Sequence, residues 1–180
     1  MGTGKSAVGR SLSRRIPGRF RDTDCELERA FEMPIPDIFL KHGEDAFRSA
    51  ETGILTKFAD GIQNNRRCDR PLVLSTGGGT ALRKENGLLL RRIGIVVCLV
   101  TTPETICKRV SKHVEQRPLL APYRNALLPR IVQLLDERMP RYEQVANIVV
   151  NTARFRQPFE VADHIMTLTD DLEEQCAQVS

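Results

Sequence analysis

Three residues near the start of the chain, Gly4, Lys5 and Ser6, are of the types that bind the phosphates of a nucleotide. They match the second half of the phosphate-binding loop G-x-x-x-x-G-K-[ST], and the apolar residues that follow have helical spacing. In such a loop, backbone N–H groups and the positive end of the helix face the phosphates. The lysine reaches the β- and γ-phosphates, and the serine hydroxyl ligates Mg²⁺. A match of three residues also arises by chance, so this hypothesis needs support from other motifs.

Two carboxylates, Asp22 and Asp24, flank Thr23 in a segment, 20–24, that is predicted to be extended. Side chains two positions apart on a strand point to the same side, so these carboxylates are expected to be adjacent. Adjacent carboxylates repel each other, and a bound cation relieves that repulsion. One carboxylate could therefore serve a metal and the other a substrate hydroxyl. The alternative is an acidic turn without a ligand.

A run of three glycines, 77–79, directly follows a short apolar segment, 71–76, of the kind that forms a buried strand. Because glycine has no Cβ, a ligand could approach this part of the backbone closely. A tight turn between a strand and a helix would also use glycine, so the run alone does not decide between the two.

Three arginines are candidates for binding anions. Arg117 lies among other basic residues in a segment, about 108–126, that is typical either of a mobile basic flap or of a solvated loop. Arg48 and Arg138 each lie in a helical stretch near apolar residues. A lone arginine in such a stretch is more often a surface residue than a ligand, so these two need support from a wider pattern.

These side chains need a scaffold, and the rest of the sequence indicates one in which strands alternate with helices. Apolar spacing and the positions of Gly and Pro predict helices over 4–16, 27–31, 47–58, 81–92, 127–137 and 161–172, and another that begins at 103. Strands are predicted over 20–24, 71–76, 93–100 and 147–151. Such alternation is typical of an α/β fold with an open parallel sheet and helices on both faces. Ligands of these folds bind beyond the carboxyl ends of the strands, where the motifs above fall.

The composition is that of one soluble domain, residues 1–180, with a small excess of basic residues. Apolar residues make up 41% of the chain, and the net charge of +4 favours small anionic ligands over nucleic acid. No apolar run approaches the roughly 18–20 residues that cross a bilayer. The cysteines are odd in number and form no CxxC pair, so we expect reduced packing residues at Cys25, Cys68, Cys98, Cys107 and Cys176. A cytoplasmic monomer without nucleic-acid or membrane partners is expected, with an upstream targeting segment left open.

Taken in their order along the chain, these motifs resemble those of the shikimate kinase family. The matching pieces span nearly the whole chain: Gly4-Lys5-Ser6, Asp22-Thr-Asp24, Phe47-Arg48 with Glu51, Gly77-Gly78-Gly79, Arg117-Pro-Leu-Leu120 and Glu137-Arg138-Met-Pro-Arg-Tyr142. The resemblance implies a P-loop kinase fold and transfer of the γ-phosphate of ATP to the 3-hydroxyl of shikimate. It also implies Mg²⁺ as cofactor and a place in the biosynthesis of chorismate and the aromatic amino acids.

The resemblance further implies a role for each matched residue. ATP would be held by the loop and the lid, namely by Gly2, Thr3, Gly4, Lys5, Ser6, Ala7 and Arg117. Shikimate would be bound by Asp24, Arg48, Gly78 and Arg138, with the two arginines on its carboxylate. Ser6 would bind Mg²⁺ directly and Asp22 through water. Asp24 would accept the proton of the reacting hydroxyl, while Lys5 and Arg117 stabilise charge on the γ-phosphoryl group.

Some positions depart from the family pattern. A complete phosphate loop needs a further glycine that would fall two residues upstream of Met1 and would end a strand in the middle of the sheet. We therefore expect that the functional protein begins at least ~8 residues further upstream and that the chain as written folds poorly. Arg141 stands where the family more often has leucine, and Arg154 only loosely matches a position that sometimes contacts adenine.

Two alternatives stay open. A non-catalytic protein of this family would account for the absent strand, but such a chain would be expected to lose some of the charged residues above, and all of them are present. Another small-metabolite kinase, such as a gluconate kinase, would keep the chemistry and change the acceptor. Arg48 and Arg138 call for a carboxylate, which gluconate also carries.

Overall fold

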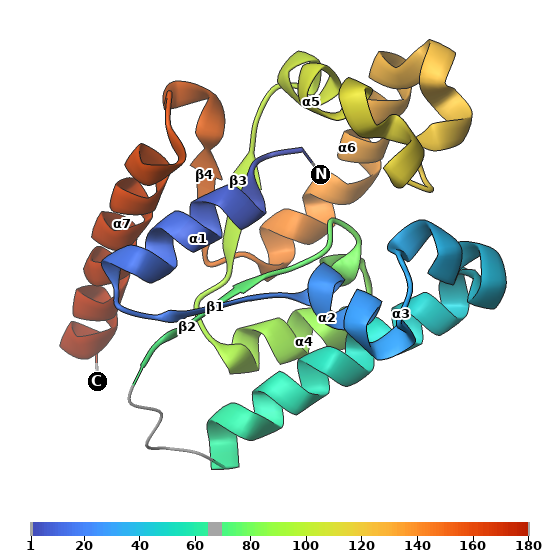
Figure 1. Cartoon of the computed structure of the whole chain (residues 1–180). Helices are drawn as coiled ribbons and strands as arrows, with labels where there is room; N and C mark the ends of the chain where they lie inside the picture. Colours follow the sequence, from blue (N-terminus) through green and yellow to red (C-terminus); the bar gives the residue numbers. More distant parts are fainter. Residues whose placement is uncertain (1, 65–69, 180) are drawn as a thin grey trace.

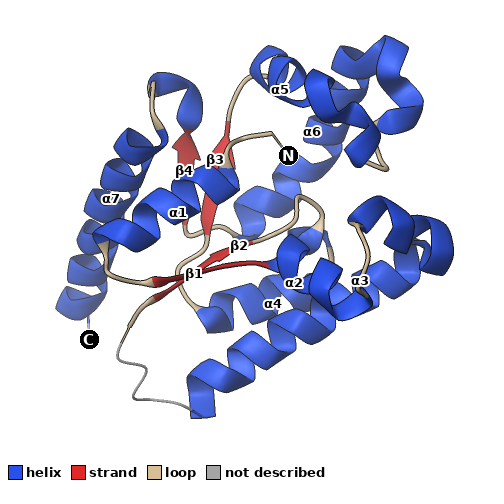
Figure 2. Ribbon diagram, in the orientation of Figure 1, coloured by secondary structure: helices blue, strands red, loops and turns tan. Residues whose placement is uncertain are grey.

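Helices and strands alternate along the chain, as the sequence predicts (Figure 1, Figure 2). The computed structural model describes residues 2–64 and 70–179. In chain order its main elements are α1 (Lys5–Arg15), β1 (Arg19–Asp22), α2 (Thr23–Phe31), α3 (Ile35–Asn64), β2 (Leu72–Ser75), α4 (Lys84–Ile93), β3 (Val97–Val100), α5 (Pro103–Val110), α6 (Leu127–Val145), β4 (Ile148–Asn151) and α7 (Pro158–Val179). Short 3₁₀ turns connect some of them, namely η1 (Thr80–Leu82), η2 (Ser111–Gln116), η3 (Ala121–Ala126) and η4 (Thr152–Arg154).

The strands pair in parallel, in two groups of two within the described residues. β1 pairs with β2, with Arg19 opposite Leu72, and β3 pairs with β4, with Val97 opposite Ile148. Helices α1 and α7 lie on one face of these strands and α4 on the other (Figure 1). The α/β class with parallel strands covered on both faces is therefore confirmed. The predicted open sheet is interrupted between β2 and β3, which do not pair with each other.

Two apolar clusters cover the two faces of the strands, and a third supports the segment predicted as a lid. On one face, Val8 of α1 and Val161 of α7 pack against Val150 of β4. On the other face, Leu55 of α3 packs against Leu90 of α4. The third cluster joins α5, the 3₁₀ turns and α6 through Ile106, Val110, Val114, Leu120, Leu127, Ile131 and Leu134.

The boundaries of several elements differ from the prediction, and the helix predicted over 47–58 is part of the longer α3. The strand predicted over 93–100 covers only Val97–Val100, because Ile93 completes α4 and packs in the cluster around Leu90. A short apolar run does not by itself distinguish the end of a helix from a strand. The helix predicted over 127–137 continues as α6 through Pro140.

None of the helices in the described ranges is both long enough and apolar enough to cross a membrane. Among the cysteines, Cys25 is exposed, Cys98 and Cys107 are half-buried, and all three are free thiols. Cys68 lies outside the described residues, as do Met1 and the side chain of Cys176.

Candidate active site

A cavity of about 510 Å³ lies at the carboxyl ends of β1 and β2, beside the start of α1. It brings together most of the residues that the sequence predicts for the site: Gly2, Gly4, Lys5, Ser6, Ala7, Asp24, Arg48, Gly78, Arg117 and Arg138. The fold therefore gathers into one cavity motifs that are spread over more than a hundred residues of sequence.

Three residues predicted from the sequence lie elsewhere. Thr3 is buried behind the loop and lines a second cavity, between β2 and β3. Asp22 is buried and accepts a hydrogen bond from the hydroxyl of Ser6, which lines the cavity. Arg154 lies in η4, outside the set of described residues that line the cavity.

The loop ahead of α1 has two glycines in the left-handed region of the backbone. Gly2 and Gly4 have positive φ angles of 65° and 92°, which glycine adopts without strain. The carbonyl of Gly4 accepts the first hydrogen bond of α1, from Val8 N at 2.9 Å. The N–H groups of the first turn that come before Val8 have no partner within the helix, so they can bind an anion. Burial lowers the pKa of Lys5, and the nearby carboxylate of Asp24 offsets this only in part. An anionic ligand would supply the missing counter-charge.

The side chains of Ser6 and Asp22 are joined directly by a hydrogen bond. Ser6 Oγ donates a hydrogen bond to Asp22 Oδ2 at 2.6 Å and lies 3.3 Å from Ser75 Oγ. The group contains only oxygen atoms, which are the ligands that Mg²⁺ prefers. No cluster of three or more His, Cys, Asp or Glu side chains is present in the described part of the chain. A magnesium ion here would therefore also need oxygens from water and from a phosphate.

The pairing of Asp22 with Asp24 differs from the prediction of one extended segment. Asp22 ends β1 and is the N-cap of α2, where its Oδ1 accepts a hydrogen bond from Asp24 N at 3.1 Å. A capping carboxylate satisfies a free N–H group of the first turn, so the chain becomes helical at Thr23. The two carboxylates are neighbours because of this cap, and Asp24 belongs to the helix.

The surroundings of Asp24 make its carboxylate a stronger base than an exposed aspartate. Burial, together with the negative charge of Asp22, raises the pKa of Asp24 to about 6, although Lys5 opposes the shift. A carboxylate with this pKa is still ionised at neutral pH, and it accepts a proton more readily than an ordinary aspartate does. Asp24 lines the cavity together with the phosphate loop, which is where a proton acceptor for a bound hydroxyl would be needed.

The three glycines after β2 leave room for side chains of the site. A Cβ at Gly77 would lie 2.8 Å from Asp24 Oδ1, and a Cβ at Gly79 would lie 2.7 Å from both Nη atoms of Arg48. Such distances are too short for any larger residue unless those side chains move. The sequence suggested that these glycines let a ligand approach the backbone, and the structure shows that protein side chains already use part of that space.

Arg48 is held by two carboxylates of its own helix. Its Nη1 donates to Glu51 Oε2 at 2.6 Å, and its Nη2 donates to Glu44 Oε1 at 3.1 Å. Glu51 is only 1% exposed and accepts a further hydrogen bond from Thr80 Oγ1 at 2.5 Å. In the sequence, Glu51 belongs to a motif that matches the family, but the sequence alone assigned Glu51 no role. Its position three residues after Arg48 on a helix was the available signal, because side chains at that spacing meet.

Helix α6 brings Arg138 to the cavity and also anchors the glycine loop. Tyr142, one turn after Arg138, donates a hydrogen bond from its hydroxyl to the carbonyl oxygen of Gly78. Arg141 donates from Nε to the carbonyl oxygen of Ala81 at 3.2 Å. The sequence assigned no role to Tyr142 or Arg141. Both tie α6 to the segment that follows β2, so the residue at 141 that departs from the family pattern has a structural contact.

The segment predicted as a lid places Arg117 in the cavity. Leu120 is fully buried in the cluster that includes Ile106 of α5, which fixes this end of the segment. Burial lowers the pKa of Arg117, while the carboxylate of Asp24 raises it. The Nε of Arg117 is buried and has no hydrogen-bond partner among the described residues. Such a cationic donor suits an anionic ligand. The mobility of 108–126 stays a prediction.

On a parallel α/β fold, a cavity that joins a phosphate-binding loop to a half-buried carboxylate base and to arginines from other helices is the arrangement of a P-loop kinase. Comparison with known proteins gives the family within this class. Residues 1–170 match the family model described as shikimate kinase, and the chain belongs to the shikimate kinase family. It is accordingly an ATP-dependent kinase.

Relatives with curated names and solved structures agree with this assignment. The chain is 40% identical over 157 residues to a shikimate kinase of Neisseria meningitidis serogroup C, a match that covers 87% of this chain and 86% of the relative. It is 43% identical over 152 residues to a shikimate kinase of Pelotomaculum thermopropionicum, covering 84% and 81%. The structure of shikimate kinase from Acinetobacter baumannii in complex with shikimate superposes with a TM-score of 0.84 at 34% identity, covering 95% and 89%.

Proposed function

We propose that this protein transfers the γ-phosphate of ATP to the 3-hydroxyl of shikimate, a step towards chorismate and the aromatic amino acids. The observation that supports this most strongly is the single cavity that holds the phosphate loop, Asp24 and two arginines suited to a carboxylate. Its two ends differ in chemistry. The loop end offers backbone N–H groups and Lys5, whereas the other end offers Arg48 and Arg138.

In the proposed reaction, Asp24 orients the acceptor hydroxyl and takes its proton as the hydroxyl oxygen attacks the γ-phosphorus. The bond between the γ-phosphorus and the bridging oxygen breaks, and ADP leaves with that oxygen. Lys5 and Arg117 stabilise the negative charge on the γ-phosphoryl oxygens during the transfer. Asp24 then releases its proton to solvent when the product leaves.

Mg²⁺ belongs to the proposal as a cofactor held by Ser6 Oγ and, through water, by Asp22. The support is the oxygen-only group in which these two side chains are 2.6 Å apart. When bound, the ion neutralises charge on the β- and γ-phosphates. Ser6 and Asp22 keep their positions in the protein through the N-cap of α2 and the start of α1.

At the acceptor end, Arg48 and Arg138 are proposed to hold the shikimate carboxylate through charge-assisted hydrogen bonds. Glu51 and Glu44 fix the guanidinium of Arg48, so little rotational freedom is lost when the substrate binds. Gluconate also carries a carboxylate and is the second acceptor to be tested. We also propose that the protein is a monomer and needs no macromolecular partner.

An assay of ATP-dependent phosphorylation with shikimate, gluconate and AMP side by side tests the proposed function. We expect turnover with shikimate and at least about 100-fold lower kcat/KM with the other two, because a site with fixed polar groups discriminates strongly against a poor match. Preference for gluconate would show that gluconate is the acceptor and that the type of reaction is unchanged. Binding of ATP and shikimate without any turnover would support the non-catalytic alternative instead.

Replacement of Arg138 by lysine is expected to weaken shikimate binding while ATP binding changes little. Lysine keeps the positive charge but lacks the planar fork that binds a carboxylate through two hydrogen bonds. A charge-assisted hydrogen bond contributes about 1.5–3 kcal/mol, so the Kd for shikimate should rise about tenfold to 150-fold in calorimetric titrations. Arg92→Lys, an exposed change on α4, serves as the matched control. Equal losses for both ligands would place Arg138 outside the acceptor end.

The raised pKa of Asp24 predicts how the rate depends on pH. Asp24 must be ionised to accept a proton, so kcat/KM for shikimate should be constant well above pH 6. Below that pH it should fall about tenfold per pH unit. The apparent pKa of the profile for the free enzyme should lie near the value of about 6, rather than at the ordinary value of 3.8. A profile that stays flat down to pH 4.5 would contradict the role of Asp24.

A further inference from the structure

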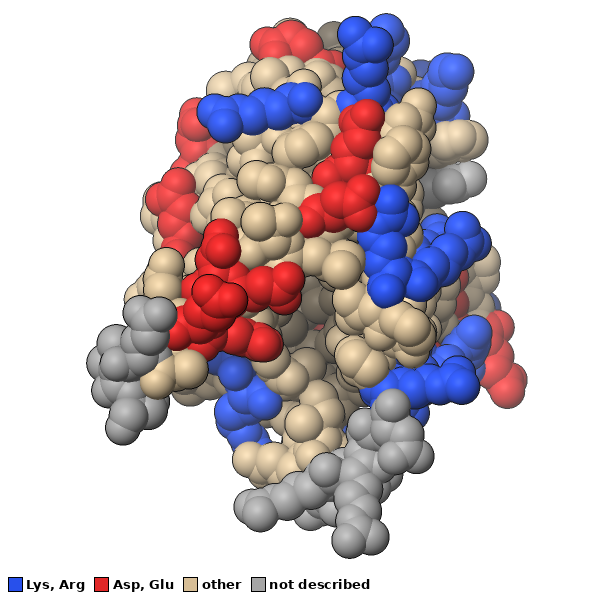
Figure 3. Space-filling model, turned by 90° about the vertical axis from the view of Figure 1, so that its left-hand side faces the viewer, with Lys and Arg blue, Asp and Glu red and all other residues tan. Residues whose placement is uncertain are grey.

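Arg48 and Glu51 form a buried ion pair at the acceptor end of the cavity. Charged side chains usually lie at a protein surface, and Figure 3 shows basic and acidic side chains standing out into solvent on one face of this molecule. The side chains of Arg48 and Glu51, by contrast, are 13% and 1% exposed. A buried ion pair is stable only when its remaining polar atoms also have hydrogen bonds. The carboxylate oxygen of Glu51 that faces away from Arg48 therefore needs a donor of its own.

That donor is the hydroxyl of Thr80. Thr80 Oγ1 donates a hydrogen bond to Glu51 Oε1 at 2.5 Å, while Glu51 Oε2 accepts one from Arg48 Nη1 at 2.6 Å. One carboxylate is thus held at both oxygens, by the threonine on one side and by the arginine on the other. Thr80 is fully buried, so water does not compete with its hydroxyl for Glu51.

The backbone of Thr80 is held on both sides. Its N–H donates to the carbonyl oxygen of Gly77 at 3.3 Å, and its carbonyl oxygen accepts a hydrogen bond from Asn86 Nδ2 at 2.9 Å. Asn86 is fully buried, and its Oδ1 accepts a hydrogen bond from Thr52 Oγ1 at 2.8 Å. Asn86 of α4 therefore joins η1 to α3, the helix that carries Glu51. This network fixes the position of the Thr80 hydroxyl relative to Glu51.

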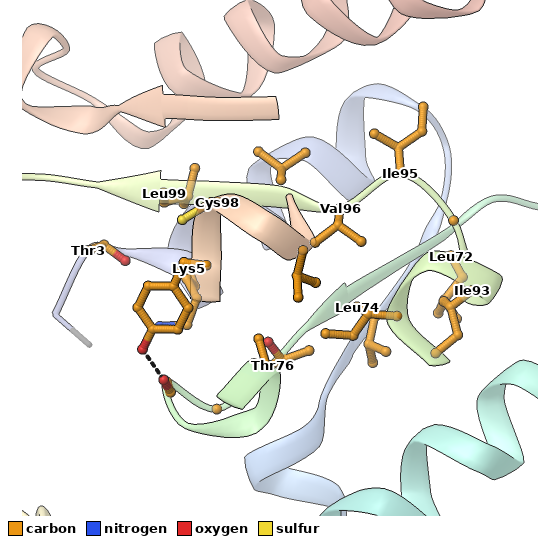
Figure 4. A pocket seen from close by; sticks show the side chains of 18 residues that line it. Thr3, Lys5, Leu72, Leu74, Thr76, Ile93, Ile95, Val96, Cys98 and Leu99 are labelled. Atoms are coloured by element: carbon orange, nitrogen blue, oxygen red, sulfur yellow. Dashed lines mark hydrogen bonds between the residues drawn. The ribbon is translucent and has the colours of Figure 1, made fainter. Parts of the chain in front are cut away.

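The three glycines that precede η1 pack against the same ion pair. A Cβ at Gly79 would lie 2.7 Å from both Nη atoms of Arg48, so the guanidinium lies directly on the backbone of this loop. The loop is anchored to α6 by the hydrogen bond from Tyr142 to the carbonyl oxygen of Gly78, which is dashed in Figure 4. Arg48 is therefore held between a fixed loop and the carboxylate of Glu51.

We propose that Thr80 is a positioning residue for the acceptor: its hydroxyl fixes Glu51, and Glu51 fixes the guanidinium of Arg48 to bind the acceptor carboxylate. This inference rests on the proposed function, in which Arg48 binds shikimate. Thr80 is not among the described residues that line the cavity, so it acts through the ion pair. Without the hydroxyl, a buried carboxylate oxygen would lose its donor, and Glu51 would hold Arg48 less firmly.

Thr80→Val, which replaces the hydroxyl by a methyl group, tests the proposal. In calorimetric titrations the Kd for shikimate should rise about fivefold to fiftyfold, because hydrogen bonds to charged groups are strong. The Kd for ATP should be unchanged. In steady-state kinetics the KM for shikimate should rise while kcat changes little, which is the pattern of lost substrate binding. Thr80→Ser keeps the hydroxyl and should keep the Kd for shikimate within about threefold of the parent value.

The matched control is Thr56→Val. Thr56 lies on the same helix as Glu51, and its hydroxyl donates to the backbone carbonyl oxygen of Thr52 at 3.0 Å. This substitution should leave the Kd values for both ligands unchanged. Thr80→Ala removes the same hydroxyl without crowding the buried site. It gives the same comparison with Thr80→Ser if the Thr80→Val protein does not fold.

NMR spectroscopy of arginine side chains tests the effect on Arg48 in the absence of any substrate. In the parent protein the two Nη atoms of Arg48 should give separate signals, because Glu51 and Glu44 hold them and slow the rotation of the guanidinium. The signals are assigned by their loss in Arg48→Lys. Thr80→Val should merge them, and Thr80→Ser should leave them separate.

Three outcomes would overturn the proposal. One is a Thr80→Val protein with unchanged Arg48 signals and unchanged shikimate affinity. Another is a loss in Thr80→Ser as large as in Thr80→Val, which would mean that packing matters and the hydroxyl does not. The third is an equal loss of affinity for shikimate and ATP, which would indicate a general effect on the fold. A parent protein that binds no shikimate, but whose Arg48 signals merge in Thr80→Val, would contradict the proposed function and still support the effect of Thr80 on Arg48.

Discussion

Asp24→Asn should lower kcat by about 10²–10⁴-fold, because the amide keeps the volume of the side chain but cannot accept a proton. KM values for ATP and shikimate should change much less, since Asn still fills the space beside Gly77. The Tm should be equal or higher. The raised pKa of Asp24 means that the fold disfavours its charged form, and Asn removes both that charge and its repulsion with Asp22.

Steady-state kinetics and thermal unfolding on the same preparation check this expectation. Asp136→Asn, an exposed change on α6, is the matched control and should leave kcat unchanged. A variant at position 24 with turnover within threefold of the parent would remove Asp24 from the mechanism. A variant that is slow only because it is unfolded would be recognised by its lowered Tm.

Arg117→Ala should lower kcat by about 10³-fold or more, the effect of losing an arginine that stabilises charge on a transferring phosphoryl group. The guanidinium lines the cavity with a buried Nε that has no partner among the described residues, so it is placed to bind an anion rather than to stabilise the fold. Since this interaction is strongest in the transition state, the Kd for ATP should change much less than kcat.

The matched control for Arg117 is Arg124→Ala, which lies in the same segment and forms an exposed ion pair with Glu115. It should leave kcat within a factor of about two, because exposed ion pairs contribute little. Single-turnover measurements with saturating ATP separate the chemical step from binding. Equal effects of the two substitutions would mean that the whole segment, rather than the guanidinium of Arg117, matters for the rate.

The sequence by itself determined those features that depend on neighbours along the chain. Thr102 and Pro103 predicted the start of α5, and Thr102 Oγ1 does accept a hydrogen bond from Thr105 N at 3.3 Å. The helical spacing after Gly4 predicted α1. The order of the motifs along the chain predicted the shikimate kinase family, which the family model confirms. Caps, periodicity and motif spacing are local properties, so they can be read without the fold.

The tertiary structure decided which side chains meet and what charge they carry. Glu51 accepts a hydrogen bond from Thr80 only because α3 packs beside η1, and no local pattern contains that contact. The raised pKa of Asp24 depends on burial and on the capping carboxylate of Asp22. The cavity between β2 and β3 likewise depends on strands that lie far apart in the sequence. Burial and electrostatic energy are set by distances in space, and sequence spacing alone does not define those distances.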